Sequence, residues 1–155
     1  MKGLSEEIIQ FFQSQGFVIV STHALDGSIH NSCKGIVEIK PGGLVYLLDL
    51  YKGKTYENLR HNSKISITAV DEHKFKGFCL KGKARIITKG NLNPQLLKAW
   101  EERITSRLTT RLLKNIRGEK GHSTHPETLL PQPKYLIALE VKEIVNFIPQ
   151  HISRR

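Results

Sequence analysis

The sequence predicts a mainly β protein, either an antiparallel barrel or a strongly curved sheet, with few flanking helices. Five or six segments rich in β-branched and aromatic residues are joined by short turns. Only one long segment has the apolar spacing of a helix, and the strand–helix alternation of a parallel nucleotide-binding sheet is missing. Since 155 residues are the size of one domain, we expect a single domain over 1–155.

A short helix is predicted near the N-terminus. Ser5 is its expected N-cap, and Glu6 and Glu7 follow where carboxylates stabilise the helix dipole. Gly16 occupies the position where such a helix ends. The apolar residues that share one face of this helix are Leu4, Ile8, Phe11 and Phe12.

The strands are delimited by turn residues. Asp26-Gly27 predicts a tight hairpin, and Pro41-Gly42-Gly43 predicts a second turn. The predicted strands are 17–22, 28–40, 44–49, 64–71, 77–88 and 135–148.

Two more helices are predicted, a short one over 55–62 and a long one with Asn93 as N-cap and Pro94 at its first position. The long helix has an apolar face that we expect to point inward, formed by Leu97, Trp100, Ile104, Leu108 and Leu112. It also has a basic stripe, formed by Arg103, Arg107, Arg111, Lys114 and Arg117. That stripe is either a solvated face opposite the buried one, which we favour, or a grip for nucleic acid or an anionic substrate.

The composition favours anionic partners. The net charge is +10, from 24 basic and 14 acidic side chains, which suits nucleic acid, a membrane surface or a phosphorylated small molecule. No segment approaches the roughly 18 apolar residues of a membrane span, and no export signal is apparent. Cys33 and Cys79 are expected to be free thiols of a cytoplasmic protein.

Gly53-Lys54-Thr55 resembles the end of a triphosphate-binding loop, but position 48, where such a loop needs glycine, is Leu48. A monophosphate cradle is the smaller prediction. With Thr55 as N-cap, the following N–H groups and the side chains of Lys52 and Lys54 would hold a phosphate. The alternative is an ordinary capped helix with solvated lysines.

Four segments in this order resemble the pyridoxamine 5′-phosphate oxidase-like superfamily of FMN-binding split barrels. They are VIVSTHALDGSIHNS, LVYLLDLYKGKTYENL, HNSKISITAVD and GFCLKGKARI, and they span about residues 17 to 88. The resemblance implies an antiparallel, Greek-key-like split β-barrel that forms a homodimer and binds FMN at the subunit interface. The chain is shorter than the vitamin oxidases and has no match to their C-terminal substrate-binding segment, so that activity is not implied.

The resemblance also implies the site. Lys54 and Thr55 would hold the phosphate, Asn58 would reach the cofactor from the helix, and Lys34 is the candidate donor to the flavin N1–C2 edge. The facing subunit would complete the pocket with residues 76–80, at the start of the next predicted strand. The complete set of cofactor-binding candidates is Asn31, Ser32, Cys33, Lys34, Leu48, Asp49, Lys52, Lys54, Thr55, Asn58, Lys76, Gly77 and Phe78.

The expected function is electron or hydride transfer through FMN, with a small-molecule substrate or a donor such as NAD(P)H. A flavin carrier without turnover and, less favoured, a nucleic-acid-binding barrel remain alternatives, as does deazaflavin or haem in the same pocket. His122 and His125 form an H-x-x-H pair in a loop, where a lid is more plausible than a metal site. His23 and His30 flank the hairpin and are more simply structural.

Overall fold

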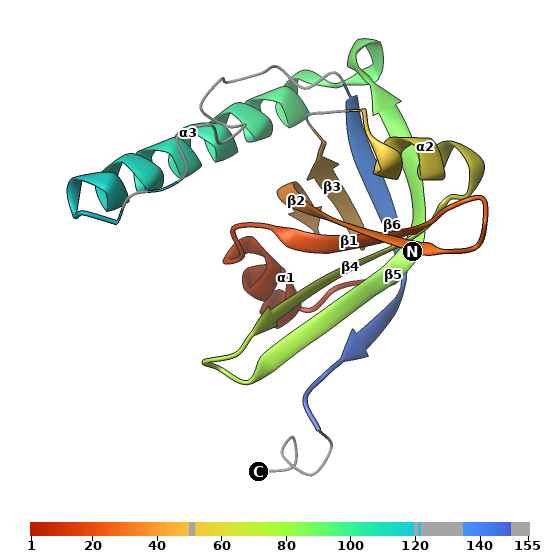
Figure 1. Ribbon diagram of the computed structural model, residues 1–155, viewed down its shortest axis with the longest axis horizontal. Helices are drawn as coiled ribbons and strands as arrows, with labels where there is room; N and C mark the ends of the chain where they lie inside the picture. Colours follow the sequence, from red (N-terminus) through yellow and green to blue (C-terminus); the bar gives the residue numbers. More distant parts are fainter. Residues whose placement is uncertain (50–51, 120, 122–134, 150–155) are drawn as a thin grey trace.

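The six strands of the protein close into an antiparallel barrel (Figure 1). The computed structural model describes residues 1–49, 52–119, 121 and 135–149. The barrel strands are β1 (Val18–His23), β2 (Ile29–Lys40), β3 (Leu44–Leu48), β4 (Lys64–Asp71), β5 (Lys76–Thr88) and β6 (Tyr135–Asn146). The helices are α1 (Glu6–Gln13), α2 (Lys54–His61) and α3 (Pro94–Ile116), and a 3₁₀ turn, η1 (Lys89–Asn91), precedes α3.

The strand order around the barrel is β1-β2-β3-β6-β5-β4, and β1 pairs with β4 to close it. The last strand, β6, therefore pairs with β5, which precedes it in strand order, and also with β3, which is distant in the sequence. Every pairing is antiparallel, which confirms the mainly β, split-barrel prediction. A β-bulge between Lys81 and Gly82 bends β5 against β6.

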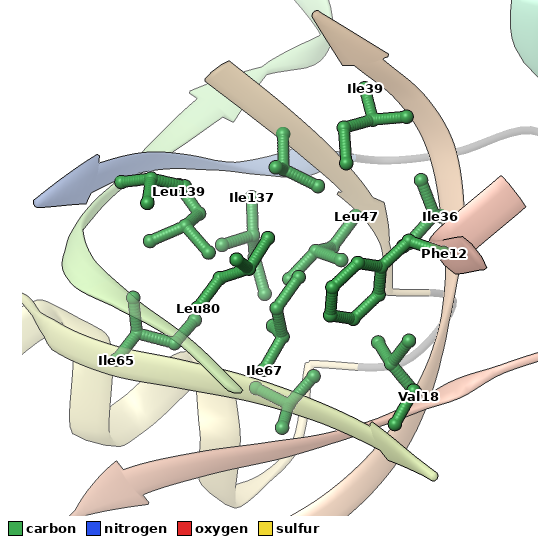
Figure 2. Packing of buried hydrophobic residues seen from close by; sticks show 14 of the residues in the cluster. Phe12, Val18, Ile36, Ile39, Leu47, Ile65, Ile67, Leu80, Ile137 and Leu139 are labelled. Carbon is green, nitrogen blue, oxygen red and sulfur yellow. The ribbon is translucent and has the colours of Figure 1, made fainter. Parts of the chain in front are cut away.

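Alternate residues of each strand fill the barrel interior. Along β1, Val18 and Val20 are buried, whereas Ile19 between them is exposed. Figure 2 shows side chains from all six strands converging on one another, with Phe12 of α1 entering from the side. Burial of these apolar groups is the main stabilising contribution to such a core.

Helix α1 begins where its sequence predicts, but it ends at Gln13 with Ser14 as C-cap, and not at Gly16. The Ser5 side chain accepts a hydrogen bond from the Ile8 N–H at 3.4 Å, which confirms Ser5 as N-cap. Phe11 and Phe12 are buried, and the Phe11 ring packs edge-to-face on Phe78 of β5 with centroids 5.2 Å apart.

Helix α3 covers the outer face of β3 and β6. Its predicted cap is confirmed, because the Asn93 side chain accepts from the Leu96 N–H. Trp100 and Ile104 are buried in a second apolar cluster, built on Tyr46, Leu48, Leu136 and Ala138 of the outer barrel face. Helix α3 therefore removes the apolar outer face of β3 and β6 from water.

Two expectations for α3 are wrong. Leu112 is 61% exposed, because the C-terminal half of the helix extends beyond the barrel (Figure 1). The solvated basic stripe is wrong for three of its five members: Arg103, Arg107 and Arg111 are half-buried and line a groove against the segment after α1, whereas Lys114 and Arg117 are exposed. Arg103 is covered because its guanidinium donates to the carbonyl oxygens of Gln13 and Gln15, at the end of α1.

None of the helices in the described part of the chain has the length and apolar character needed to cross a membrane.

Candidate functional site

The predicted phosphate cradle lies at the start of α2, but its cap differs from the prediction. Gly53 is the N-cap, in extended backbone conformation, and no side chain caps the helix. The first intrahelical bond runs from the Glu57 N–H to the Gly53 carbonyl. The N–H groups of Lys54, Thr55 and Tyr56 thus have no acceptor within the helix, which makes this helix end a favourable place for an anion.

Thr55 is not the N-cap because its hydroxyl has another partner. The side chain is 2% exposed, and its Oγ1 lies 2.9 Å from the Ser32 Oγ on β2. This hydroxyl pair joins the first turn of α2 to the barrel wall. Its effect is to fix the helix start, so that the free N–H groups are held in place by the fold.

Two lysines stand beside these N–H groups. Lys54 is exposed and lies 3.8 Å from Glu57, one turn along the helix. The Lys52 ammonium lies 5.1 Å from the centre of the Tyr56 ring. An exposed ion pair and an exposed cation–π contact each contribute little to stability, so both cations can turn toward an incoming phosphate.

A buried charge cluster lies next to the cradle. The Lys34 ammonium and the Asp49 carboxylate form an ion pair of 2.7 Å, and their side chains are only 12% and 4% exposed. The Tyr135 hydroxyl donates a second hydrogen bond to the same carboxylate. Ser32 and Lys34 point to the same side of β2, as the strand alternation predicts, which places both clusters at one end of the barrel.

Burial raises the pKa of the Tyr135 phenol well above its usual value, and the hydrogen bond to Asp49 raises it further. Tyr135 therefore stays neutral and donates to the carboxylate. Its ring also packs edge-to-face on Tyr56, with centroids 4.9 Å apart, so Tyr135 contacts both α2 and the ion pair.

Sequence reasoning missed Tyr135 as a site residue. It is separated from Asp49 by 86 positions and opens a strand that looks purely structural. One signal was available, since a tyrosine in a buried strand needs a partner for its hydroxyl, and a nearby carboxylate is a common one.

The remaining candidates divide between the two faces of the barrel wall. Asn58 is buried and donates to the Thr22 hydroxyl at 3.0 Å, so its amide ties α2 to β1. Asn31 and Cys33 lie on the outer face of β2, where the Asn31 amide oxygen accepts from Ser21. Leu48 also faces outward and packs under α3.

The single chain does not bring Lys76, Gly77 and Phe78 to the cradle. They begin β5 at the β4–β5 turn, which Figure 1 draws far from α2. Phe78 is 3% exposed and is part of the core. Their predicted role in the pocket of a facing subunit stays a prediction.

Among the described residues, no three histidine, cysteine, aspartate or glutamate side chains are grouped to hold a metal ion. The H-x-x-H pair of His122 and His125 lies outside the described residues. Cys33 and Cys79 are both free, the first exposed and the second buried.

A closed antiparallel barrel with a basic helix start at one end defines the class of split-barrel proteins. Comparison with family models agrees: the model for pyridoxamine 5′-phosphate oxidase matches residues 4–144. The chain belongs to this family. A search of the curated proteins found no match.

Solved structures share the fold at low sequence identity. HupZ from Group A Streptococcus has a TM-score of 0.64 and 20% identity, over 94% of this chain and 94% of that one. A Clostridium acetobutylicum protein related to general stress protein 26 of B. subtilis has a TM-score of 0.56 and 17% identity, over 96% and 99%. HutZ, the heme storage protein from Vibrio cholerae, has a TM-score of 0.53 and 18% identity, over 95% of each chain.

Proposed function

We propose that the protein binds FMN at the start of α2 and transfers electrons or hydride through it, as a homodimer. The observation that carries the proposal is the α2 N-terminus, which has no side-chain cap and is flanked by Lys52 and Lys54. A dianionic phosphate suits these cations and N–H donors. Membership of the family supports FMN as the molecule that brings the phosphate.

The donor set at this end of the barrel fits the rest of the cofactor as well. When bound, FMN supplies reversible acceptance of a hydride or of single electrons. Lys34 is the donor that we assign to the flavin N1–C2 edge, where a cation favours the reduced form. Asp49 and Tyr135 hold the Lys34 ammonium in position and limit its exposure to water.

Homodimerisation is part of the proposal because the start of β5 carries an uncovered apolar patch. Val70, Phe75 and Phe147 are 62%, 62% and 47% exposed, and they surround a hollow of about 170 Å³ beside Lys76 and Gly77. We call these three residues the β5-start patch. A second subunit that covers it would bring Lys76 and Gly77 into an interface, as the predicted pocket requires.

The proposed reductant is a small-molecule donor such as NAD(P)H. The described site has no buried histidine or carboxylate poised as a general base, since Asp49 is engaged by Lys34 and Tyr135. Hydride transfer needs no such base. A carrier that binds FMN without turnover has the same site and differs only in reactivity.

Titration of the purified protein with FMN and with riboflavin tests the cradle, because riboflavin lacks only the phosphate. We expect FMN to bind at least about tenfold more tightly, and Lys52→Ala/Lys54→Ala to remove most of this difference. Lys40→Ala/Lys98→Ala removes the same charge from exposed positions outside the cradle and the β5-start patch and should change neither affinity.

A parallel titration with haem addresses the second cofactor, which the described function of HutZ brings into consideration. His30 lies on the same side of β2 as Ser32 and Lys34 and is the histidine that would hold the haem iron. If the wild type binds haem tightly but does not bind FMN, and His30→Ala no longer binds haem, then haem and not flavin is the cofactor.

A further inference from the structure

The basic stripe of α3 forms one wall of a groove that the proposed cofactor site does not use. The groove has a volume of about 450 Å³ and is lined by residues of α3 and of the segment that follows α1. Its cationic lining residues are Arg103, Arg107, Arg111 and Lys114, and Glu119 is the one carboxylate among its described lining residues. Such an excess of positive charge in a concave surface attracts anions.

Arg103 is built into the groove. Its guanidinium donates to the carbonyl oxygens of Gln13 and Gln15, at 3.3 and 2.9 Å, and so uses the acceptors at the C-terminal end of α1. Its Nε is buried and has no hydrogen-bond partner in the described part of the chain. The side chain is thus fixed by the fold with one polar group still to satisfy.

Arg107 is also placed by a specific feature of the barrel wall. A side-chain carbon at Gly35 of β2 would lie 2.5 Å from the Arg107 Nη1. The absence of a side chain at position 35 leaves room for the guanidinium against the barrel wall. Arg107 is half-buried there, and a partly ordered arginine loses less entropy than a fully exposed one when it binds a phosphate.

The other rim of the groove carries an aromatic ring. Phe17 lines the groove and is 59% exposed, which is unusual for a phenylalanine next to a barrel strand. From Arg103 to Arg111 the helix rises about 12 Å, which is enough for a diphosphate and an attached nucleoside. An exposed ring beside a row of arginines suits a ligand with an aromatic base and phosphates.

We propose that this groove binds a nucleoside diphosphate or triphosphate, with the phosphates on Arg107 and Arg111 and the base against Phe17. The half-buried arginines and the limited volume favour a discrete ligand over a nucleic-acid strand, which needs a continuous track. The site is independent of the cofactor cradle, since no residue of the cradle lines it.

Isothermal titration of the full chain with ADP, pyrophosphate and adenosine tests the proposal. We expect ADP to bind most tightly and pyrophosphate more weakly, with adenosine weakest. Arg107→Gln/Arg111→Gln should weaken ADP binding by more than about tenfold, and Phe17→Ala should bring ADP to the level of pyrophosphate. The control is Lys74→Gln/Lys98→Gln, which removes two charges outside the groove and should have little effect.

Three results would overturn the proposal: no ADP binding, ADP binding that the control pair weakens equally, or an equal affinity for ADP and pyrophosphate. A different result would assign the groove to nucleic acid instead: no ADP binding, together with steeply salt-dependent binding of a single-stranded oligonucleotide that the arginine variant loses. Circular dichroism of each variant checks that the fold is retained. FMN titration of the arginine variant should match the wild type, which separates a failure here from a failure of the cradle.

Discussion

The Lys34 ammonium lies 2.7 Å from the Asp49 carboxylate, between β2 and the residue that follows β3, with both side chains almost removed from water. A buried ion pair is costly to desolvate, and well-packed apolar residues often replace one without loss of stability. Its presence at the end of the barrel beside the α2 N-terminus fits a role in binding better than a role in folding.

Removal of one partner of this pair should destabilise the protein strongly. Lys34→Met leaves the Asp49 carboxylate buried beside Tyr135, and we expect a loss of about 3 kcal/mol in the free energy of unfolding. Lys34→Met/Asp49→Leu removes both charges and should be less destabilised than the single variant. Urea unfolding measures both. A single variant as stable as the wild type would mean that the pair is open to water.

Tyr135→Phe should cost about 1 to 3 kcal/mol, because it removes a buried donor from Asp49. The pH dependence gives a sharper signature. The pKa of Tyr135 is raised in the folded state, so its contribution to stability is complete below about pH 10 and is lost as the pH rises further. Between pH 8 and pH 11, the free energy of unfolding should therefore fall more steeply for the wild type than for Tyr135→Phe. Parallel curves would contradict the buried hydrogen bond.

Much of the fold follows from the local sequence. Strands β1 and β4 alternate in burial as their apolar residues predict, and the caps at Ser5 and Asn93 are signals confined to a few residues. The turn at Asp26-Gly27 is equally local, with Gly27 at a φ of 83°. Such features depend on neighbours in the chain, so they can be predicted without a tertiary structure.

The features that were missed depend on distant contacts. The start of α2 shifted from Thr55 to Gly53 because Ser32, 23 positions away, takes the Thr55 hydroxyl. Tyr135 joined the site through a strand that is inserted between β3 and β5. Arg107 became half-buried because Gly35 leaves room for it on the barrel wall. None of these partners is visible from spacing.

Gly82→Ala should be among the most damaging substitutions on the barrel wall. A side-chain carbon at position 82 would overlap the Glu140 carbonyl across the β5–β6 bulge, and backbone cannot move aside as a flexible side chain can. We expect a loss of about 1 to 3 kcal/mol or more. Gly42→Ala is the control, because a carbon there meets nothing within 4 Å. Thermal unfolding of both variants compares them, and equal melting temperatures would contradict the close approach.

The proposed dimer should depend on the β5-start patch. Phe75 has a φ of 50°, a conformation that asparagine tolerates, so Phe75→Asn removes the ring and spares the turn. We expect the wild type to sediment at twice the chain mass, and Phe75→Asn/Phe147→Ser to weaken the dimer by more than about tenfold. Leu25→Asn, at an 80% exposed position of another turn, should leave it intact. A wild type that is monomeric at micromolar concentration would remove the dimer from the account.

The central claim is that the start of α2 holds the phosphate of a flavin. The most direct measurement is the visible absorption spectrum of the purified protein after incubation with FMN and desalting. The account predicts retained flavin bands at close to one FMN per chain, and their loss from Lys52→Ala/Lys54→Ala but not from Lys40→Ala/Lys98→Ala. A wild-type protein that emerges colourless, or a cradle variant that keeps its flavin, would contradict it.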